Sequence, residues 1–176
     1  MMSSFKYVFS KLKVVYLILP LLFLLESCGV YSFTGTTLSA DLESITIENF
    51  GMATAGGPPN LTLNFNESLK EYYQRNTNLK LLPSNGDLYL AGAITRYDMT
   101  PVATTSGDKA AMNRLTIAVE VTFQNSQNEE ESFEKEFSFY QDFSQEQTLT
   151  DVEPNLVPKI LDQLVLNIFN DTAAQW

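Results

Sequence analysis

The chain has 176 residues, a formal net charge of −10, one cysteine and no histidine. This length allows one domain with a substantial core, and the acidic balance argues against nucleic acid as a partner. Without histidine the chain lacks the commonest general base and the commonest transition-metal ligand. No GxGxxG, GxxxxGK[ST] or EF-hand spacing occurs. The composition therefore predicts a protein that is not an enzyme and holds no metal or cofactor.

The first 27 residues are typical of a bacterial lipoprotein signal peptide. Three lysines precede an apolar run, residues 14–25, which is 12 residues long. A membrane-spanning helix needs roughly 20 such residues, so the run is more typical of a secretory signal. A small residue, Ser27, precedes Cys28, whereas Glu26 departs from the usual small or apolar residue. We expect cleavage before Cys28 and lipidation of its thiol. The alternative is an uncleaved anchor with an incidental cysteine.

Cleavage would leave a lipidated N-terminal tether, residues 28–41, and a single domain, residues 42–176. Removal of the signal takes away three lysines and one glutamate, so the mature chain carries a net charge of −12. With Cys28 lipidated, no thiol is left for a disulfide, a metal or a nucleophile. The domain must therefore be held together by packing and hydrogen bonds.

The first half of the domain shows one strand pattern and one helix pattern. Residues 44–48 alternate apolar with polar side chains and are rich in β-branched residues, which predicts a strand. Apolar residues then recur every three or four positions from about Asn60 to residues 75–78, which predicts a helix. Residues 79–82 form a short apolar segment, and residues 83–87 have turn chemistry.

The second half predicts strands at residues 88–97, 114–124 and 132–140, followed by an amphipathic helix that reaches Phe169. Because proline is tolerated best in a first helical turn, we expect the regular part of this helix to begin between Pro154 and Pro158. The order strand, helix, strand, strand, strand, helix predicts an α+β fold. Its simplest form has two helices packed on one face of a four-stranded mixed sheet.

Four features together resemble the lipopolysaccharide-assembly lipoprotein family LptE, in its Bacteroidetes type. They are the start Cys28-Gly29 with the aromatic residue Tyr31 close behind it, the element order, the turn Asn85-Gly86-Asp87-Leu88 and the strand entry Asn113-Arg114-Leu115-Thr116-Ile117. The resemblance covers residues 28–176. It implies the two-helix, four-strand layer already expected from the pattern.

The resemblance also implies a location and two partners. Members of this family sit in the outer membrane, partner and partly plug the LptD β-barrel, and bind lipopolysaccharide non-covalently. Gly29 is not the aspartate that retains enterobacterial lipoproteins in the inner membrane, and no acidic cluster follows Cys28. We therefore expect a lipid-anchored protein at the periplasmic face of the outer membrane.

The candidate ligand contacts lie in and beside a long connection, residues 98–113. Hairpin loops usually have two to five residues, and longer connections are often functional. Lys109 and Arg114 are candidates to face phosphate groups, and Met112 is a candidate to meet acyl chain or barrel wall. The alternative is a solvated loop with incidental charges, since Asp108 lies beside Lys109.

Other features favour structure over chemistry. The three phenylalanines at 133, 137 and 139 are expected in the core, and Trp176 is left open between core and partner surface. Glu134 and Glu136 suggest a glycosidase-like carboxylate pair only weakly, because acidic residues two apart on a strand are usually solvated. The runner-up function is an outer-membrane lipoprotein that binds and activates a periplasmic peptidoglycan enzyme.

Overall fold

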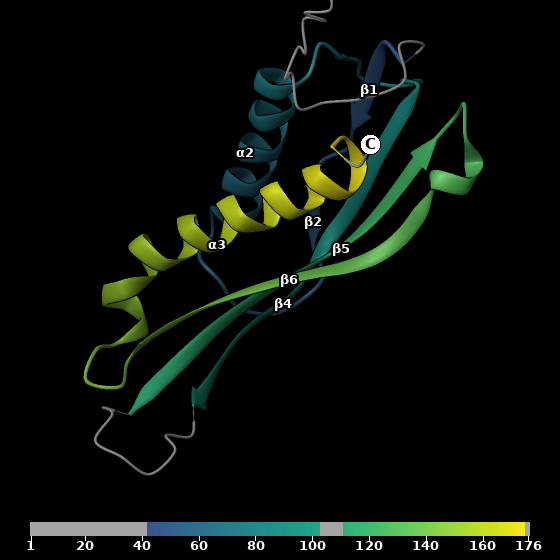
Figure 1. Cartoon of the computed structure of the whole chain (residues 1–176). Helices are drawn as coiled ribbons and strands as arrows, with labels where there is room; N and C mark the ends of the chain where they lie inside the picture. The colour runs from purple at the N-terminus through teal and green to yellow at the C-terminus, as the bar shows by residue number, and fades with distance from the viewer. Residues whose placement is uncertain (1–41, 103–110, 175–176) are drawn as a thin grey trace, which may run out of the picture. The chain divides into compact units, whose positions relative to one another are not determined.

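The computed structural model describes residues 42–102 and 111–174, which all lie in one compact unit, residues 35–176. The expectations for Cys28, the tether, Lys109 and Trp176 fall outside the described residues. Within them, the expected α+β architecture is confirmed: two helices cover one face of a mixed sheet (Figure 1).

The sheet has the strand order β3-β1-β4-β5-β6, and β2 pairs with β4 beside this path. β1 runs parallel to β3 and to β4, whereas β4, β5 and β6 are antiparallel. The four expected strands are present, but the described sheet has six strands, because two further strands of two residues each, β2 and β3, join it. Such short strands carry no detectable period in sequence. The bounds are β1 Ser44–Ile47, β2 Gly51–Met52, β3 Lys80–Leu81, β4 Leu88–Val102, β5 Met112–Asn125 and β6 Phe133–Ser144.

Strands β4, β5 and β6 are longer than the sequence indicated. β4 runs to Val102 and pairs there with Met112, the first residue of β5. The prediction of a connection over residues 98–113 is therefore wrong in its bounds, whereas Arg114 lies in a strand, as expected. β4 and β5 extend farther than expected because their pairing continues through polar residues after a bulge between Ile94 and Arg96. We call this end of the sheet the distal end, and the end where β1 begins the proximal end.

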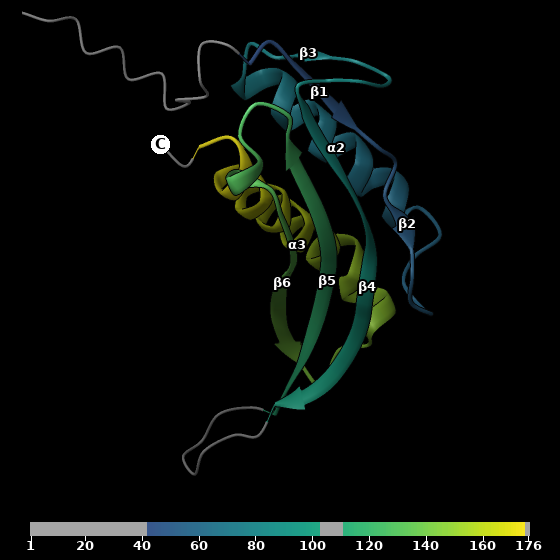
Figure 2. The same cartoon turned by 90° about the vertical axis from the view of Figure 1, so that its right-hand side faces the viewer.

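The two long helices are α2, Leu61–Asn76, and α3, Leu149–Thr172, and a short 3-10 turn, η2, covers Glu129–Glu131. Figure 2 shows both long helices behind the sheet, on the same face. α3 begins before both prolines, so its predicted start was wrong. Thr148 caps the helix by accepting a hydrogen bond from the backbone of Asp151, and this cap together with buried Val152 starts the helix one turn before Pro154.

The core lies between the helices and the alternating apolar side chains of β4 and β5. Phe137 is buried, and Phe133 and Phe139 are half-buried against the same core, which confirms their predicted role. A buried hydrogen bond between the hydroxyls of Tyr73 and Thr172 joins the two helices, and burial raises the pKa of Tyr73. The largest fully buried side chains of the core include Phe50, Phe65, Leu69, Leu88, Leu90, Ile94, Leu115 and Ile117.

Candidate functional site

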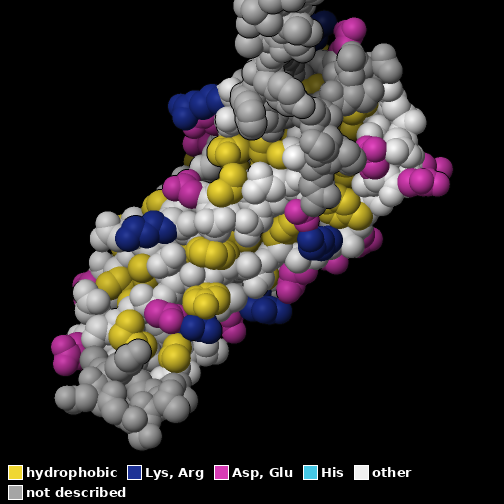
Figure 3. Space-filling model, viewed as in Figure 1, with side chains coloured by type: hydrophobic (Ala, Val, Ile, Leu, Met, Phe, Trp, Pro, Cys, Tyr) yellow, Lys and Arg dark blue, Asp and Glu magenta, His cyan; other side chains and the backbone are white. Residues whose placement is uncertain are grey.

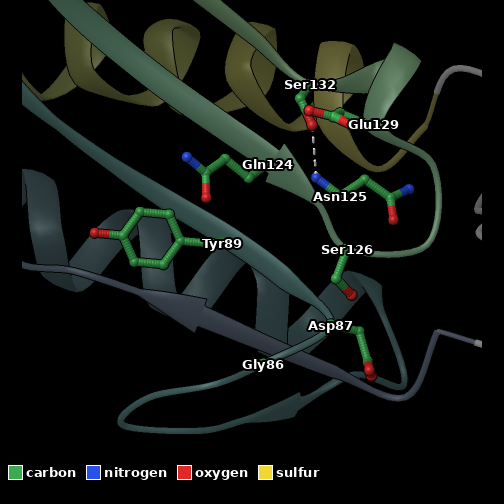
Figure 4. A pocket seen from close by; sticks show the side chains of 8 residues that line it. All are labelled: Gly86, Asp87, Tyr89, Gln124, Asn125, Ser126, Glu129 and Ser132. Atoms are coloured by element: carbon green, nitrogen blue, oxygen red, sulfur yellow. Dashed lines mark hydrogen bonds between the residues drawn. The ribbon is translucent and has the colours of Figure 1, made fainter.

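A polar hollow of about 420 Å³ opens at the proximal end, between the start of β4, the end of β5 and η2. Figure 4 shows that its side chains do not converge: Tyr89 and Gln124 lie on one side of the strands, whereas Asp87 points away from them. It is lined by Gly86, Asp87, Tyr89, Gln124, Asn125, Ser126, Glu129 and Ser132.

Of the two acidic residues that line this hollow, Asp87 is engaged in hydrogen bonds within the fold. One carboxylate oxygen accepts hydrogen bonds from the Ser44 hydroxyl at 2.7 Å, the Ser44 backbone at 2.9 Å and the Glu43 backbone at 3.0 Å. The hydrogen bond from the Ser44 hydroxyl contributes most to lowering the pKa of Asp87. Asp87 therefore fastens the start of β4 to the start of β1, which explains the turn that contributes to the family resemblance.

A second network closes the other wall of the hollow. The Asn125 side-chain oxygen accepts hydrogen bonds from the backbones of Gln127 and Asn128, and its amide donates to Glu131 at 2.7 Å. These contacts hold the turn between β5 and η2. The described residues also contain no group of three or more acidic residues placed to hold a metal ion. Asp87 and Asn125 therefore hold backbone turns together on two sides of the hollow.

The distal end presents a different arrangement around Arg114. Its guanidinium donates two hydrogen bonds to the Asp142 carboxylate, at 2.7 and 2.9 Å, and lies 3.6 Å from the centre of the Tyr140 ring. This pairing raises the pKa of Arg114 and lowers the pKa of Asp142. Tyr140 is 46% exposed, and Met112 shares the sheet face of Arg114. The distal end thus offers a positioned cation beside aromatic and apolar surface.

Sequence reasoning singled out Arg114 but missed Tyr140 and Asp142. The strand pairing places Asp142 opposite Arg114, and Tyr140 opposite Thr116. Alternation along β6 could have indicated that both side chains share its polar face, although it could not have supplied the register.

The weak suggestion of a carboxylate pair at Glu134 and Glu136 gains no support from the geometry. Both side chains are exposed on the face of the sheet that points away from the two helices, and neither lines the hollow. Glu136 lies 3.4 Å from the guanidinium of Arg96 and accepts a hydrogen bond from Thr95. This arrangement is a solvated ion pair on a strand.

Comparison with known proteins assigns the fold. A family model described as LptE, lipopolysaccharide-assembly, matches residues 42–172. A search of curated proteins finds no match. The solution structure of an uncharacterized lipoprotein B from Nitrosomonas europaea is similar, with 12% identity, a TM-score of 0.50 and coverage of 72% of this chain and 79% of that one. At this identity the likeness shows the fold alone.

Two further structures match over a similar span. The rare lipoprotein B from Shewanella oneidensis has 10% identity and a TM-score of 0.45, and covers 72% of this chain and 89% of that one. The minor lipoprotein from Acinetobacter baumannii has 17% identity, the same TM-score of 0.45, and the same coverage of 72% and 89%. In the described part of the chain, no helix has both the length and the apolar character needed to cross a bilayer.

Proposed function

Because this chain belongs to the LptE family of lipopolysaccharide-assembly proteins, we propose that it is an outer-membrane lipoprotein subunit of a lipopolysaccharide translocon. In this role it partners a large β-barrel of the LptD kind, partly fills its lumen and binds lipopolysaccharide without covalent chemistry. The observation that carries the proposal is the family match, which spans every described helix and strand.

We propose that lipopolysaccharide contacts the distal end. Arg114 is about one-third exposed and its guanidinium lies over the Tyr140 ring, so it can meet a phosphate at the surface when the phosphate takes the place of Asp142. Lys109 would supply a second cation there. Met112, on the same face, and Met99, 47% exposed on the opposite face of the ribbon, offer apolar contacts for acyl chains.

Lipidation of Cys28 is the proposed hold on the membrane. Each buried CH₂ group contributes about 0.8 kcal/mol, so several acyl chains anchor a protein stably where one does not. A Cys28→Ala protein should then lose its outer-membrane fractionation in cells that lack the barrel. If that protein still fractionated with the outer membrane without the barrel, the proposed anchor would be wrong.

The test of the function is purification of the mature lipoprotein from membranes in mild detergent. We expect a β-barrel to co-purify, and depletion of the lipoprotein to reduce lipopolysaccharide at the cell surface. Recovery as a free monomer, under conditions that keep other barrel complexes intact, would contradict the proposal. Altered cross-linking of the cell wall with normal surface lipopolysaccharide would instead support the activator of a peptidoglycan enzyme.

A further inference from the structure

The turn that leads into β4 contains the single Asn-Gly dipeptide of the chain, Asn85-Gly86. An asparagine before glycine is prone to lose its side-chain amide, because glycine has no side chain to hinder attack by its backbone nitrogen on the amide carbon. Asn85 is exposed, and its side-chain amide lies 3.5 Å from the Ser84 hydroxyl. Water can therefore reach the atoms that take part in this reaction.

The fold requires both residues of the dipeptide. Asn85 has a backbone φ of 56°, in the left-handed region that asparagine tolerates better than most residues do. At Gly86, an added Cβ would lie 2.6 Å from the backbone nitrogen of Thr46 and 2.7 Å from the carbonyl carbon of Ile45. Any larger residue would push the turn away from β1. A chemically reactive dipeptide is therefore built into the junction between β1 and β4.

The same packing restrains the reactive nitrogen. The backbone N–H of Gly86 donates a hydrogen bond to the Thr46 hydroxyl at 3.0 Å, and Thr46 is only 2% exposed. The next backbone N–H, that of Asp87, donates to the Ser44 hydroxyl at 3.1 Å. The Gly86 nitrogen must lose the proton that it shares with Thr46 before it can attack. Ring closure also rotates the peptide group between Asn85 and Gly86, and the contacts with β1 oppose this rotation.

We propose that Asn85 is a deamidation site that is protected while β1 stays on the turn, that reacts when β1 detaches, and whose isoaspartate product keeps β1 detached. The Gly86 nitrogen loses its proton and bonds to the side-chain carbonyl carbon of Asn85. The bond from that carbon to the amide nitrogen breaks, and the nitrogen leaves with the proton as ammonia. One water molecule then opens the cyclic imide at either of its carbon–nitrogen bonds, which gives aspartate or isoaspartate at position 85. This inference does not depend on the proposed function.

The isoaspartate product changes the length of the main chain. Its backbone runs through the former side chain, which places one extra carbon atom directly before Gly86. The hydrogen bonds of Gly86 with Thr46 and of Asp87 with Ser44 depend on the present spacing of the turn along β1. We therefore expect this product to break both contacts and to leave β1 without its hold on the turn.

Either product also adds a negative charge to the proximal end. Gly86 and Asp87 line the hollow together with Glu129 of η2, whose three residues are all glutamates. Acidic side chains gather around η2 in Figure 3. A further carboxylate near them adds repulsion between like charges. Both products share this charge, whereas only isoaspartate has the extra carbon, so the two effects can be measured separately.

The first test compares the folded protein with an unfolded reference. The mature lipoprotein and a synthetic peptide of residues 82–88 are kept in the same warm, mildly alkaline buffer, and mass spectrometry follows the loss of the amide at position 85. We expect the protein to react about tenfold more slowly or less, because reaction requires local opening at β1. A peptide that does not deamidate, or a protein that reacts as fast as the peptide, would overturn the inference.

The variant Thr46→Val tests the restraint directly. It keeps the shape of the side chain and removes the hydroxyl, so Asn85 should deamidate about fivefold faster than in the wild type, the factor expected for one hydrogen bond of ordinary strength. The control Thr116→Val makes the same change within β5 and should react at the wild-type rate. Circular dichroism verifies that all three proteins are folded, and hydrogen exchange at the Gly86 amide should accelerate only in Thr46→Val. Equal deamidation rates in the three proteins would overturn the inference.

A last comparison separates the extra carbon from the added charge. Asn85→Asp carries the charge of both products on an unaltered backbone, and position 85 is exposed, so its unfolding midpoint in urea should fall only slightly. The isoaspartate form, isolated by chromatography from aged wild-type protein, should unfold at a clearly lower urea concentration. It should also lose protection from hydrogen exchange at Gly86. Equal midpoints and equal protection in the two proteins would show that isoaspartate does not detach β1.

Discussion

The proximal and distal ends of the sheet use polar side chains in different ways. At the proximal end, polar side chains bind backbone: Asp87 fastens β4 to β1, and the Asn125 side-chain oxygen accepts hydrogen bonds from the backbones of Gln127 and Asn128. At the distal end, the pair of Arg114 and Asp142 joins two exposed side chains on neighbouring strands. Polar groups at the proximal end therefore hold the fold, whereas those at the distal end remain accessible to a ligand.

This contrast predicts where substitutions should cost stability and where they should change binding. A proximal or central substitution removes or displaces backbone contacts that nothing else replaces. A distal substitution alters an exposed pair whose strands remain joined by backbone hydrogen bonds. The largest effect is expected at Gly92, where an added side chain would collide with the backbone of β5.

Gly92→Ala should destabilise the protein most. A Cβ at this position would lie 2.0 Å from the carbonyl oxygen of Glu120 and 2.6 Å from the Phe50 ring, so the β5 backbone would have to move. We expect a loss of about 3 kcal/mol in the free energy of unfolding, measured by urea denaturation of the mature protein. Gly51→Ala is the control, because nothing lies within 4 Å of the added methyl group. Equal losses in the two variants would contradict the close approach.

The elements that the sequence predicted best are those whose apolar side chains recur with a regular period. The period-two patterns around residues 44–48 and 114–124 predicted β1 and β5 closely, because their alternate side chains enter the core. The helix at residues 61–76 was equally clear from its apolar spacing. These elements are set by local patterns of burial, and such patterns can be read without the partner strand.

The distal end was predicted less well for a physical reason. Residues 98–102 are exposed or half-buried and include Pro101, so they resemble a loop, yet cross-strand pairing with β5 keeps them extended. Asp142 meets Arg114 across 28 residues of sequence, a contact that depends on register. The start of α3 was missed because the cap at Thr148 outweighs two prolines inside the helix. Non-local pairing and capping, which no period reveals, decided these features.

Asp87→Asn should give an intermediate effect with a defined pH dependence. Hydrogen bonds to the carboxylate lower the pKa of Asp87 below its ordinary value of 3.8. The ionised group therefore stabilises the fold above pH 3.8, and this stabilisation is lost as the pH falls through the lowered pKa. The free energy of unfolding of the wild type should exceed that of the variant at neutral pH, and the difference should shrink below pH 3.8.

Ser44→Ala is the matched control for this pH dependence. The Ser44 hydroxyl makes the largest contribution to the lowered pKa of Asp87, so its removal should move that pKa back toward its ordinary value. Titration of Asp87 by NMR in the wild type and in Ser44→Ala measures the shift directly. If the free energies of unfolding of wild type and Asp87→Asn differed by the same amount at every pH down to pH 3, the contacts of Asp87 with the start of β1 would not depend on its charge.

The smallest effect on stability is expected at the distal end, where one ion pair gives two opposite predictions for binding. Arg114 and Asp142 are 33% and 32% exposed, so breaking their pair should change the free energy of unfolding only slightly. Arg114→Gln removes the cation and should weaken retention of lipopolysaccharide on the purified complex. Asp142→Asn removes the competing carboxylate, leaves Arg114 free to pair with phosphate, and should strengthen that retention. If both variants weakened retention equally at unchanged stability, the pair would position another ligand contact, and Arg114 itself would not bind the phosphate.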